Sequence, residues 1–345
     1  MIKKLSLVMI SLCLVACSQM PAKPSAPSVM PESSSEAYLS APVVTFVHSA
    51  DVNEFVQKMV EQYHFDPDSL SALLSQAQMD PLLISMMNHP NEKRLSWYQY
   101  RALFINPEVI KEGQDFVQQN QEAFKLAERR YGVPPGVIAG IVGVETRYGL
   151  NEGHVSALNA LYTLSFAYPR RETYFQNELA QFLVLTRAAN LDPVQVKSSY
   201  AGALGMPQFM PSAYRQYAVS EAKHYPDLFN NSSDVILSVG HYFAQMGWQK
   251  GEPIAVPAVS SRKTPISGAL IDQSMTLAQF AQLGIVPTGL KHAARYRDQT
   301  AKLLELKGKS APEYWLVFHN FSVIKRYNAS ALYAMTVFQL SALIQ

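Results

Sequence analysis

The sequence contains very little cysteine. Only Cys13 and Cys17 occur among its 345 residues. Cys13 lies inside an apolar N-terminal run that has the form of a cleaved export signal, so the mature chain would keep Cys17 alone. We therefore exclude internal disulfides, a catalytic thiol and a thiolate metal site, and we expect packing to provide the stability.

Charged residues and long apolar runs are also scarce. Charged side chains make up 16% of the chain and the formal net charge is +2. No acidic or basic block of the kind that binds nucleic acid is present. No segment after the N-terminal run approaches the roughly 20 apolar residues that span a bilayer. The composition, 48% hydrophobic, is that of a globular protein, and the length allows about two domains with a sizeable core.

The N-terminus predicts a lipoprotein. A short basic start precedes apolar residues 5–16, which are too few to span a membrane and have the pattern of a secretory signal. The segment ends in Leu14-Val15-Ala16-Cys17, which resembles the bacterial lipobox, so we predict lipidation of Cys17. Ser18 stands where an inner-membrane retention signal would have Asp, which favours the outer membrane, facing the periplasm. The alternative is a plain signal peptide that happens to contain a cysteine.

The rest of the chain is predicted to be mainly helical. Apolar residues recur at helical spacing, and capping residues precede several of these segments. The predicted helices cover residues 51–63, 69–77, a short segment after Asp80, 106–130, 133–149, 157–167, 172–189, 232–248, 276–283 and 329–344. Asn328 is predicted to cap the last of them. Residues 252–306 show short β-like runs instead, and residues 314–318 have the pattern of a strand.

Residues 133–149 carry a single acid in an apolar helix. Ile138 and Ile141 precede Glu145 by seven and four residues, which places the acid on an apolar stripe. Burial there would disfavour the ionised form and raise the pKa of the carboxyl, as a general acid requires. The alternative is a structural acid at the helix edge that reaches water or Arg147.

Residues 198–212 have the composition of a structured loop, with two glycines and two prolines. No Asp or Glu occurs between Gln195 and Val219. Ser199 and Gln208 offer neutral hydrogen-bonding groups, which suit a ligand rich in hydroxyls and amides. Glycosidases usually place two carboxylates across the bond that they cut. The lack of a second acid here therefore favours an acid-only mechanism in which the substrate supplies the nucleophile.

Three motifs in a fixed order carry a family resemblance. They are residues 143–149 (GVETRYG), 164–171 (LSFAYPRR) and 199–212 (SYAGALGMPQFMPS). Together they resemble the membrane-bound lytic murein transglycosylase B family, and the resemblance runs from about Trp97 to the C-terminus. It implies a mainly α fold: a lysozyme-like helical core with an accessory helical domain and a small β-containing domain.

The composition and the resemblance divide the chain into five parts. They are a lipoprotein signal peptide at 1–17, a disordered tether at 18–42, a helical domain at 43–120 completed by the C-terminal segment 312–345, a lysozyme-like catalytic core at 121–250 and the small β-containing domain at 251–311. The tether is rich in Pro, Ser and Ala, and we expect it to separate the lipid from the folded part.

The resemblance implies a peptidoglycan lytic transglycosylase. Such an enzyme cuts the β-1,4 bond between N-acetylmuramic acid and N-acetylglucosamine in glycan strands and leaves 1,6-anhydro ends. Glu145 stands at the family's catalytic position, as general acid and then as base on the C6 hydroxyl, and Ser199 would orient the 2-acetamido group. The other substrate-binding residues that the resemblance implies are Gln208, Arg170, Arg171, Tyr174, Tyr327, Asn328, Tyr333 and Tyr100.

One part of the family pattern is missing. Family members can carry an EF-hand-like calcium loop after the Gln208 loop, and the matching stretch here is 220–227. Its alternate positions are Ser220, Ala222, His224 and Pro226. Calcium takes about six to eight oxygen ligands, which Asp234 alone cannot supply. We predict no metal at this loop and no cofactor.

Three other interpretations stay open. A hydrolytic muramidase with the same helical core would activate water with another acid, such as Glu152. A non-catalytic peptidoglycan-binding lipoprotein would make Glu145 incidental. A scaffold for other cell-wall enzymes would explain the tether, but it would not explain why Glu145, Ser199 and Gln208 occur together. The products separate the first of these from a transglycosylase, because hydrolysis leaves reducing ends and transglycosylation leaves anhydro ends.

Overall fold

The structure, a computed structural model, describes residues 49–88, 95–261, 266, 268–290 and 292–344. The predicted signal peptide, the lipidation site Cys17 and the tether lie outside these ranges. Within them, no helix combines the length and the apolar character needed to cross a membrane.

The described part of the chain is mainly helical, as predicted. Its α-helices are α1 Ser49–Tyr63, α2 Pro67–Leu74, α3 Pro81–Asn88, α4 Trp97–Phe104, α5 Pro107–Gln119, α6 Gln121–Tyr131, α7 Pro135–Thr146, α8 Ala157–Ala167, α9 Glu172–Ala189, α10 Pro211–Tyr217, α11 Ser232–Gln245, α12 Leu277–Gln282, α13 His319–Tyr327 and α14 Ala331–Ser341. Its strands are β1 Val155–Ser156, β2 Lys197–Ser198, β3 Ala255–Ser260, β4 Ser274–Thr276, β5 Ile285–Pro287, β6 Thr300–Lys307 and β7 Pro312–Val317.

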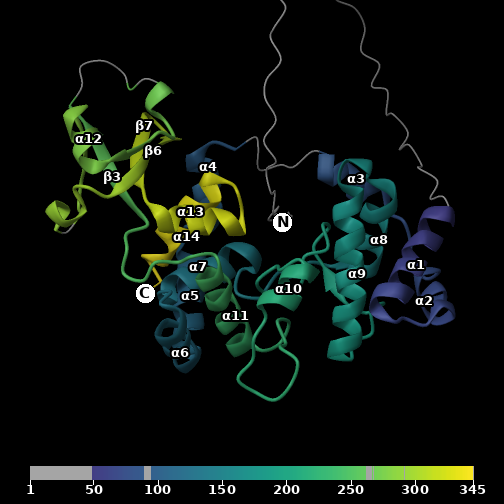
Figure 1. Ribbon diagram of the computed structural model, residues 1–345. Helices are drawn as coiled ribbons and strands as arrows, with labels where there is room; N and C mark the ends of the chain where they lie inside the picture. The colour runs from purple at the N-terminus through teal and green to yellow at the C-terminus, as the bar shows by residue number, and fades with distance from the viewer. Residues whose placement is uncertain (1–48, 89–94, 262–265, 267, 291, 345) are drawn as a thin grey trace, which may run out of the picture.

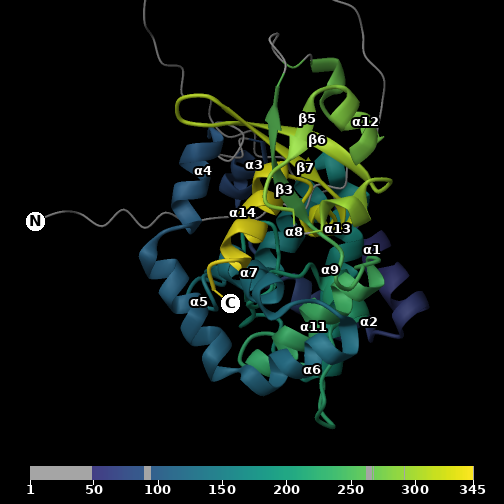
Figure 2. The same ribbon diagram turned by 90° about the vertical axis from the view of Figure 1, so that its left-hand side faces the viewer.

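The helices form two groups. In one group, α1 packs against α9 and α3 packs against α8. In the other, α5, α6, α11 and α14 all contact α7. Figure 1 shows the larger sheet and α12 at one end of the molecule, α1 and α2 at the other, and α10 between the two groups. Figure 2 shows the strands stacked above α5, α6 and α11. α14 packs on α4 as well as on α7, and the division into domains stays a prediction.

The larger sheet has five antiparallel strands in the order β4-β6-β7-β3-β5. It has a hydrophobic core of its own, which includes Val256, Phe280, Leu303 and Leu316. The small β-containing part of the predicted fold is therefore present. β7 lies in the middle of this sheet, although the predicted boundary after residue 311 placed it with the helical domain.

The helix predicted at 106–130 is interrupted. The structure has α5 and α6 there, separated at Asn120. The Asn120 side chain donates to the Phe116 carbonyl oxygen at 2.8 Å. Asparagine competes in this way with the backbone bonds that continue a helix, so a single amide interrupts an otherwise regular apolar pattern.

The prediction that Asn328 caps the last helix is wrong. α14 begins at Ala331, and the Ser330 hydroxyl accepts a hydrogen bond from the Tyr333 N–H. The Asn328 side chain accepts from the Ser330 N–H at 3.0 Å, so it shapes the turn before the helix. α13, which was not predicted, ends just before this turn.

α7 is buried on every side. All residues from Gly136 to Thr146 are buried, so Glu145 lies in an apolar helix without an exposed face, and not on a stripe. Pro135 begins the helix, where its missing N–H costs little. At Gly140, an added Cβ would lie 3.0 Å from the Val337 carbonyl oxygen of α14. This close approach fixes α7 against α14.

Candidate active site

Glu145 occupies the last turn of α7 and is 5% exposed. Its Oε1 accepts a hydrogen bond of 2.6 Å from the hydroxyl of Tyr333, a residue of α14 that is 1% exposed. A short hydrogen bond to a carboxyl in a dry site is strong and holds the side chain in one place. The burial of Glu145 agrees with the environment that the sequence predicted. The neutral state of its carboxyl stays a prediction.

Tyr327 connects this pair to the loop at 198–212. The rings of Tyr327 and Tyr333 are stacked, with centroids 6.5 Å apart and planes at 12°. The Tyr327 hydroxyl donates to the Pro207 carbonyl oxygen. The end of α13 and the first turn of α14 thus bridge Glu145 and the loop.

Thr146 makes a second connection to the same loop. Its hydroxyl lies 2.8 Å from the Met206 carbonyl oxygen, to which it donates, and it accepts from the Gly149 N–H at 3.1 Å. Sequence reasoning assigned no role to Thr146, because its loop partner lies 60 positions away. The residue next to the acid therefore holds the loop at a fixed distance from it.

The loop folds as a tight hairpin. Leu204 and Phe209 form an antiparallel bridge, and Gln208 has left-handed backbone with φ 51°. The side-chain NH₂ of Gln208 donates to the carbonyl oxygens of Gly205 and Glu152 at 2.9 and 3.1 Å. These bonds fix the amide group, so its oxygen is the atom that can accept a hydrogen bond from a ligand.

Ser199 begins the loop and is 7% exposed. Its Oγ accepts from the Ala203 N–H at 3.1 Å, and its own N–H donates to the Ala203 carbonyl oxygen at 3.0 Å. Because a serine hydroxyl also has one proton to donate, Ser199 can offer a donor to a neutral group such as an amide oxygen.

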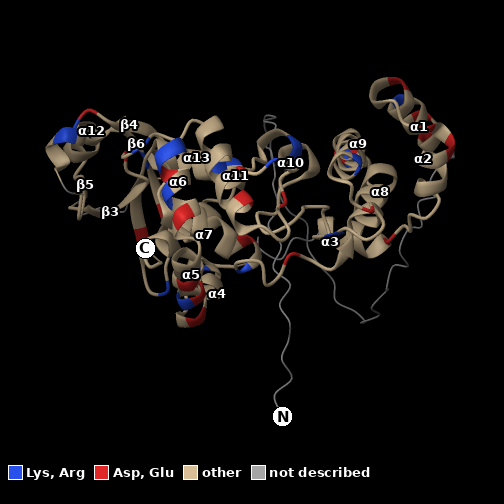
Figure 3. Ribbon diagram, turned by 90° about the horizontal axis from the view of Figure 1, so that it is seen from below, with Lys and Arg blue, Asp and Glu red and all other residues tan. Residues whose placement is uncertain are grey.

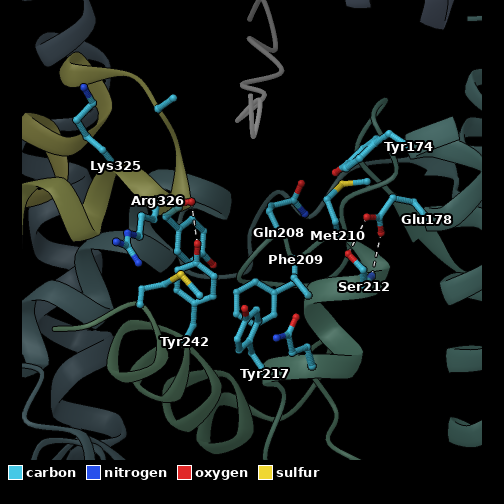
Figure 4. A pocket seen from close by; sticks show the side chains of 15 residues that line it. Tyr174, Glu178, Gln208, Phe209, Met210, Ser212, Tyr217, Tyr242, Lys325 and Arg326 are labelled. Atoms are coloured by element: carbon cyan, nitrogen blue, oxygen red, sulfur yellow. Dashed lines mark hydrogen bonds between the residues drawn. The ribbon is translucent and has the colours of Figure 1, made fainter. Parts of the chain in front are cut away.

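A cavity of about 520 Å³ opens beside the loop (Figure 4). Pockets for small ligands typically enclose about 300–1,000 Å³. The lining residues are Tyr174, Glu178, Gln208, Phe209, Met210, Ser212, Ala213, Gln216, Tyr217, Tyr242, Met246, Lys325, Arg326, Tyr327 and Ala329. Three of the predicted substrate-binding residues, Tyr174, Gln208 and Tyr327, are among them. Glu145 is not a lining residue and reaches the cavity wall through Tyr333 and Tyr327.

Arg170 and Arg171 lie in a short 3₁₀ turn, Pro169–Arg171, that leads into α9. The Arg171 guanidinium carbon is 4.0 Å from the centroid of the Tyr174 ring, a cation–π contact on the cavity wall. Arg170 is exposed and lies 3.5 Å from the Asn88 side-chain oxygen. The structure thus brings Arg171 to the cavity through Tyr174 and leaves Arg170 at the surface.

Tyr100 and Asn328 occupy core positions. Tyr100 is 2% exposed on α4, with its ring 5.2 Å from that of Phe104. Asn328 is 4% exposed and accepts from the Ser330 N–H. Neither residue lines the cavity, and their roles as substrate ligands stay predictions.

Glu178 is a cavity residue that sequence reasoning missed. It is 2% exposed on α9, and its two oxygens accept from the Ser212 N–H at 2.9 Å and from the Ser212 hydroxyl at 2.6 Å. Burial raises the pKa of Glu178, and the two hydrogen bonds oppose that rise. Its burial could have been predicted from the sequence. Glu178 follows Phe175 by three positions and precedes Phe182 by four, so all three side chains lie on one apolar face of the helix.

Tyr242 of α11 was also missed. Its hydroxyl donates to the Arg326 carbonyl oxygen at 2.8 Å, and its ring lies 5.0 Å from that of Tyr327. Figure 4 shows Gln208 and Met210 between Tyr174 on one side and Tyr242 on the other. An aromatic residue in an apolar helix is a core residue by default, so Tyr242 could not be distinguished from the core on its sequence position alone.

Glu152 is the other acid near the loop with a shifted pKa. Burial and the negative charge of Asp227 raise the pKa of Glu152 to about 7. Its carbonyl oxygen supports Gln208, but Glu152 does not line the cavity. Glu145 also lies outside the lining, so the cavity lining does not separate these two acids.

The stretch matched to the family calcium loop does not fit a calcium ion. The Asp234 carboxylate accepts from the Asp227 N–H at 2.9 Å, and the Asp227 carboxylate accepts from the N–H groups of Phe229 and Asn230. One oxygen of each carboxylate thus accepts backbone donors. Calcium needs about six to eight oxygens directed at one point, and Ala222 and Pro226 bring no side-chain oxygen to this stretch. In the described ranges, no three His, Cys, Asp or Glu side chains are grouped as metal ligands would be. The lack of a cofactor stays a prediction.

The family model for the transglycosylase SLT domain matches residues 48–342. The chain belongs to the transglycosylase SLT domain family. This transglycosylase is 38% identical, over 304 residues, to membrane-bound lytic murein transglycosylase B of Escherichia coli (strain K12). The alignment covers 86% of this chain and 82% of that relative.

Two solved structures share the fold of this transglycosylase. Soluble lytic transglycosylase SltB1 from Pseudomonas aeruginosa matches with a TM-score of 0.78 and 36% identity over 85% of this chain and 97% of that one. Escherichia coli lytic transglycosylase Slt35, in complex with calcium, matches with a TM-score of 0.78 and 38% identity over 85% and 92%. These matches confirm the mainly α, lysozyme-like fold and the enzyme class, lytic transglycosylase.

Proposed function

We propose that this transglycosylase cleaves the β-1,4 bond between N-acetylmuramic acid and N-acetylglucosamine in the glycan strands of peptidoglycan and leaves 1,6-anhydro ends. The name of the Escherichia coli relative, a murein transglycosylase, supports the substrate. The observation that carries the chemistry is Glu145, a carboxyl 5% exposed and held by the Tyr333 hydroxyl. It lies beside a loop that contains no acid between residues 195 and 219.

In this reaction Glu145 acts twice. It gives its proton to the glycosidic oxygen as the bond from that oxygen to C1 of the muramic acid breaks. The oxygen of the 2-acetamido group stabilises the positive charge at C1. The Glu145 carboxylate then takes the proton of the C6 hydroxyl while the oxygen of that hydroxyl bonds to C1. Glu145 ends protonated again, and no water is consumed.

The neighbouring residues then have distinct roles. The Ser199 hydroxyl would donate to the acetamido oxygen, and the fixed amide oxygen of Gln208 would accept from a sugar hydroxyl. Tyr174 and Tyr327 would provide aromatic walls for the sugar rings. Arg171, with Arg170 beside it, would bind a lactyl or peptide carboxylate, since a guanidinium pairs with a carboxylate through two parallel bonds.

Digestion of purified peptidoglycan by the full-length chain and by Glu145→Gln tests the proposal. The glutamine has the same shape but can neither donate the proton nor take one. We expect anhydro ends from the wild-type protein, seen by mass spectrometry, and a loss of about 10²- to 10⁴-fold in the variant, the range of general acid–base catalysis. Equal activity in both proteins would exclude Glu145 as the acid and favour a protein that only binds peptidoglycan.

Analysis of the same products distinguishes transglycosylation from hydrolysis. Glu178 lines the cavity, but Ser212 holds both of its oxygens. Glu152 lies outside the lining, as Glu145 does. Since the C6 hydroxyl of the substrate supplies the nucleophile, we expect anhydro ends and no reducing ends beyond background. Reducing ends would favour hydrolysis, with Glu152 as the candidate base.

We also propose that a lipid on Cys17 holds the chain at the outer membrane, facing the periplasm. The membrane-bound relative supports a membrane location, and the lipobox-like sequence supplies the attachment point. We expect wild-type protein to incorporate labelled palmitate, and Cys17→Ser to incorporate none and to leave the membrane fraction. A Cys17→Ser variant that stays in the membrane would contradict the anchor.

A further inference from the structure

The turn that follows Glu145 has an unusual backbone. Arg147 and Tyr148 are consecutive non-glycine residues with φ values of 53° and 59°, in the left-handed region. Residues other than glycine persist there only when the surrounding structure holds them. Two in succession, within three positions of Glu145, indicate that this turn is fixed from outside.

The first restraint is an ion-pair network with α5. The Arg147 guanidinium donates from Nε and Nη2 to both oxygens of Glu112 at 2.6 Å, and Nη2 also lies 2.6 Å from an oxygen of Glu108. Glu112 is only 27% exposed, which limits screening by water. A guanidinium held through two parallel bonds has a defined direction as well as a neutralised charge.

The second restraint is a slot for the Tyr148 ring. A Cβ added at Gly113 of α5 or at Gly143 of α7 would overlap the Tyr148 hydroxyl, so the two glycines make room for it. The ring lies 5.5 Å from that of Phe116, also of α5. The Tyr148 hydroxyl makes no hydrogen bond to any residue that the structure describes, so shape places this ring.

Helix α5 takes part in both restraints, and α7 contributes Gly143 to the second. Figure 3 shows α5 beside α7 with acidic and basic residues along it. We infer that Glu112, Arg147 and Tyr148 are positioning residues. Their contacts with α5 hold the turn after Glu145 in place and thereby fix the position of the carboxyl relative to the Gln208 loop. The inference rests on the proposed function of Glu145.

The network also settles the position of the cation nearest to Glu145 in the sequence. The sequence left open that Glu145 pairs with Arg147. Arg147 is instead bound by two carboxylates of α5, so its charge is neutralised there. Thr146, between the two, keeps its hydroxyl on the Met206 carbonyl oxygen. A shift of the turn would therefore move the acid and the loop together.

The test compares Glu112→Gln with Glu122→Gln. Glu122 forms an exposed ion pair with Lys125 on α6, so the same substitution there is a matched control. We expect Glu112→Gln to stay folded at the assay temperature, as the control does, and to keep a KM within about twofold of wild type. Its kcat for anhydro ends should fall about tenfold, because small displacements of a catalytic group are costly.

A second variant covers the case in which Glu112→Gln does not fold. Arg147→Asn removes the ion pair but keeps a residue that tolerates left-handed backbone. Its kcat should fall by the same factor, and the double variant should fall no further than either single one. Independent, multiplying losses would overturn the inference.

The outcomes separate this inference from the proposed function. If wild-type protein forms no anhydro ends, the proposed function fails. If wild-type protein forms them and Glu112→Gln matches Glu122→Gln in kcat, the positioning role fails while the function stands. A fall in kcat accounted for by the unfolded fraction of the variant would likewise overturn the positioning role.

Discussion

Replacing Tyr333 with phenylalanine tests the hydrogen bond that fixes Glu145. The substitution removes one hydroxyl from a ring that is 1% exposed and keeps the ring that stacks on Tyr327. The lost bond is the 2.6 Å contact to Oε1 of Glu145. A hydrogen bond to an ionised group contributes about 1.5–3 kcal/mol.

This energy bears on catalysis because Glu145 becomes a carboxylate once it has protonated the leaving oxygen. The Tyr333 hydroxyl then faces a full negative charge. Since about 1.4 kcal/mol corresponds to a factor of ten in rate, Tyr333→Phe should lower kcat by about 10- to 100-fold. KM should change little, because Tyr333 does not line the cavity.

The assay is the rate of formation of anhydro ends at saturating peptidoglycan, with melting curves to confirm folding. Tyr98→Phe is the matched control, since Tyr98 is 44% exposed on α4. If kcat of Tyr333→Phe equals that of Tyr98→Phe, the bond from Tyr333 does not support the acid, and the reasoning from its geometry is refuted.

Three more predictions follow from the other polar groups near the cavity. Glu178→Gln keeps one acceptor oxygen for the two Ser212 donors, so it should reduce stability by about 1–3 kcal/mol in denaturant titrations; an unchanged midpoint would contradict this. The pKa of Glu152 is raised to about 7 by burial and by Asp227, so folding takes up a proton between pH 4.5 and 7 and stability falls as pH rises through that window. Glu152→Gln should therefore raise the melting temperature more at pH 8 than at pH 5. An equal change at both pH values would contradict a raised pKa of Glu152. Gln208→Ala should raise KM by about tenfold through loss of a cavity contact, and an unchanged KM would remove Gln208 from the binding surface.

The buried acid could be predicted from the sequence because helical periodicity is local. Ile138, Ile141 and Glu145 lie within two turns, so their spacing alone placed the carboxyl among apolar side chains. Its partner Tyr333 lies 188 positions away. No periodic pattern joins two such residues, and the family resemblance implied only that Tyr333 binds substrate.

Helix ends and sheet membership were harder to predict than helices. Asn120 interrupts the predicted 106–130 helix through one side-chain bond to its own backbone, and apolar spacing does not record such a bond. β7 pairs locally with β6 across the short connection at 308–311, but its other neighbour, β3, lies far earlier in the chain. The sequence of β7 does not specify that long-range pairing. The conformation of the turn at Arg147 could not be predicted either, because the partners of Arg147 lie on another helix, α5.

Glu178 is a second carboxylate at the cavity. The Gln208 loop itself contains no acid that could activate water. The structure nevertheless places an acid on the cavity wall, from α9. Because both of its oxygens accept from Ser212, rotating either one towards a water molecule would leave a buried donor unpaired, at about 1–3 kcal/mol. A hydrolase needs a base that can take a proton from water. The Glu178 carboxylate instead accepts two hydrogen bonds from Ser212 and so connects α9 to the start of α10. The acid-only mechanism therefore depends on how the second acid is bound, and not on its absence.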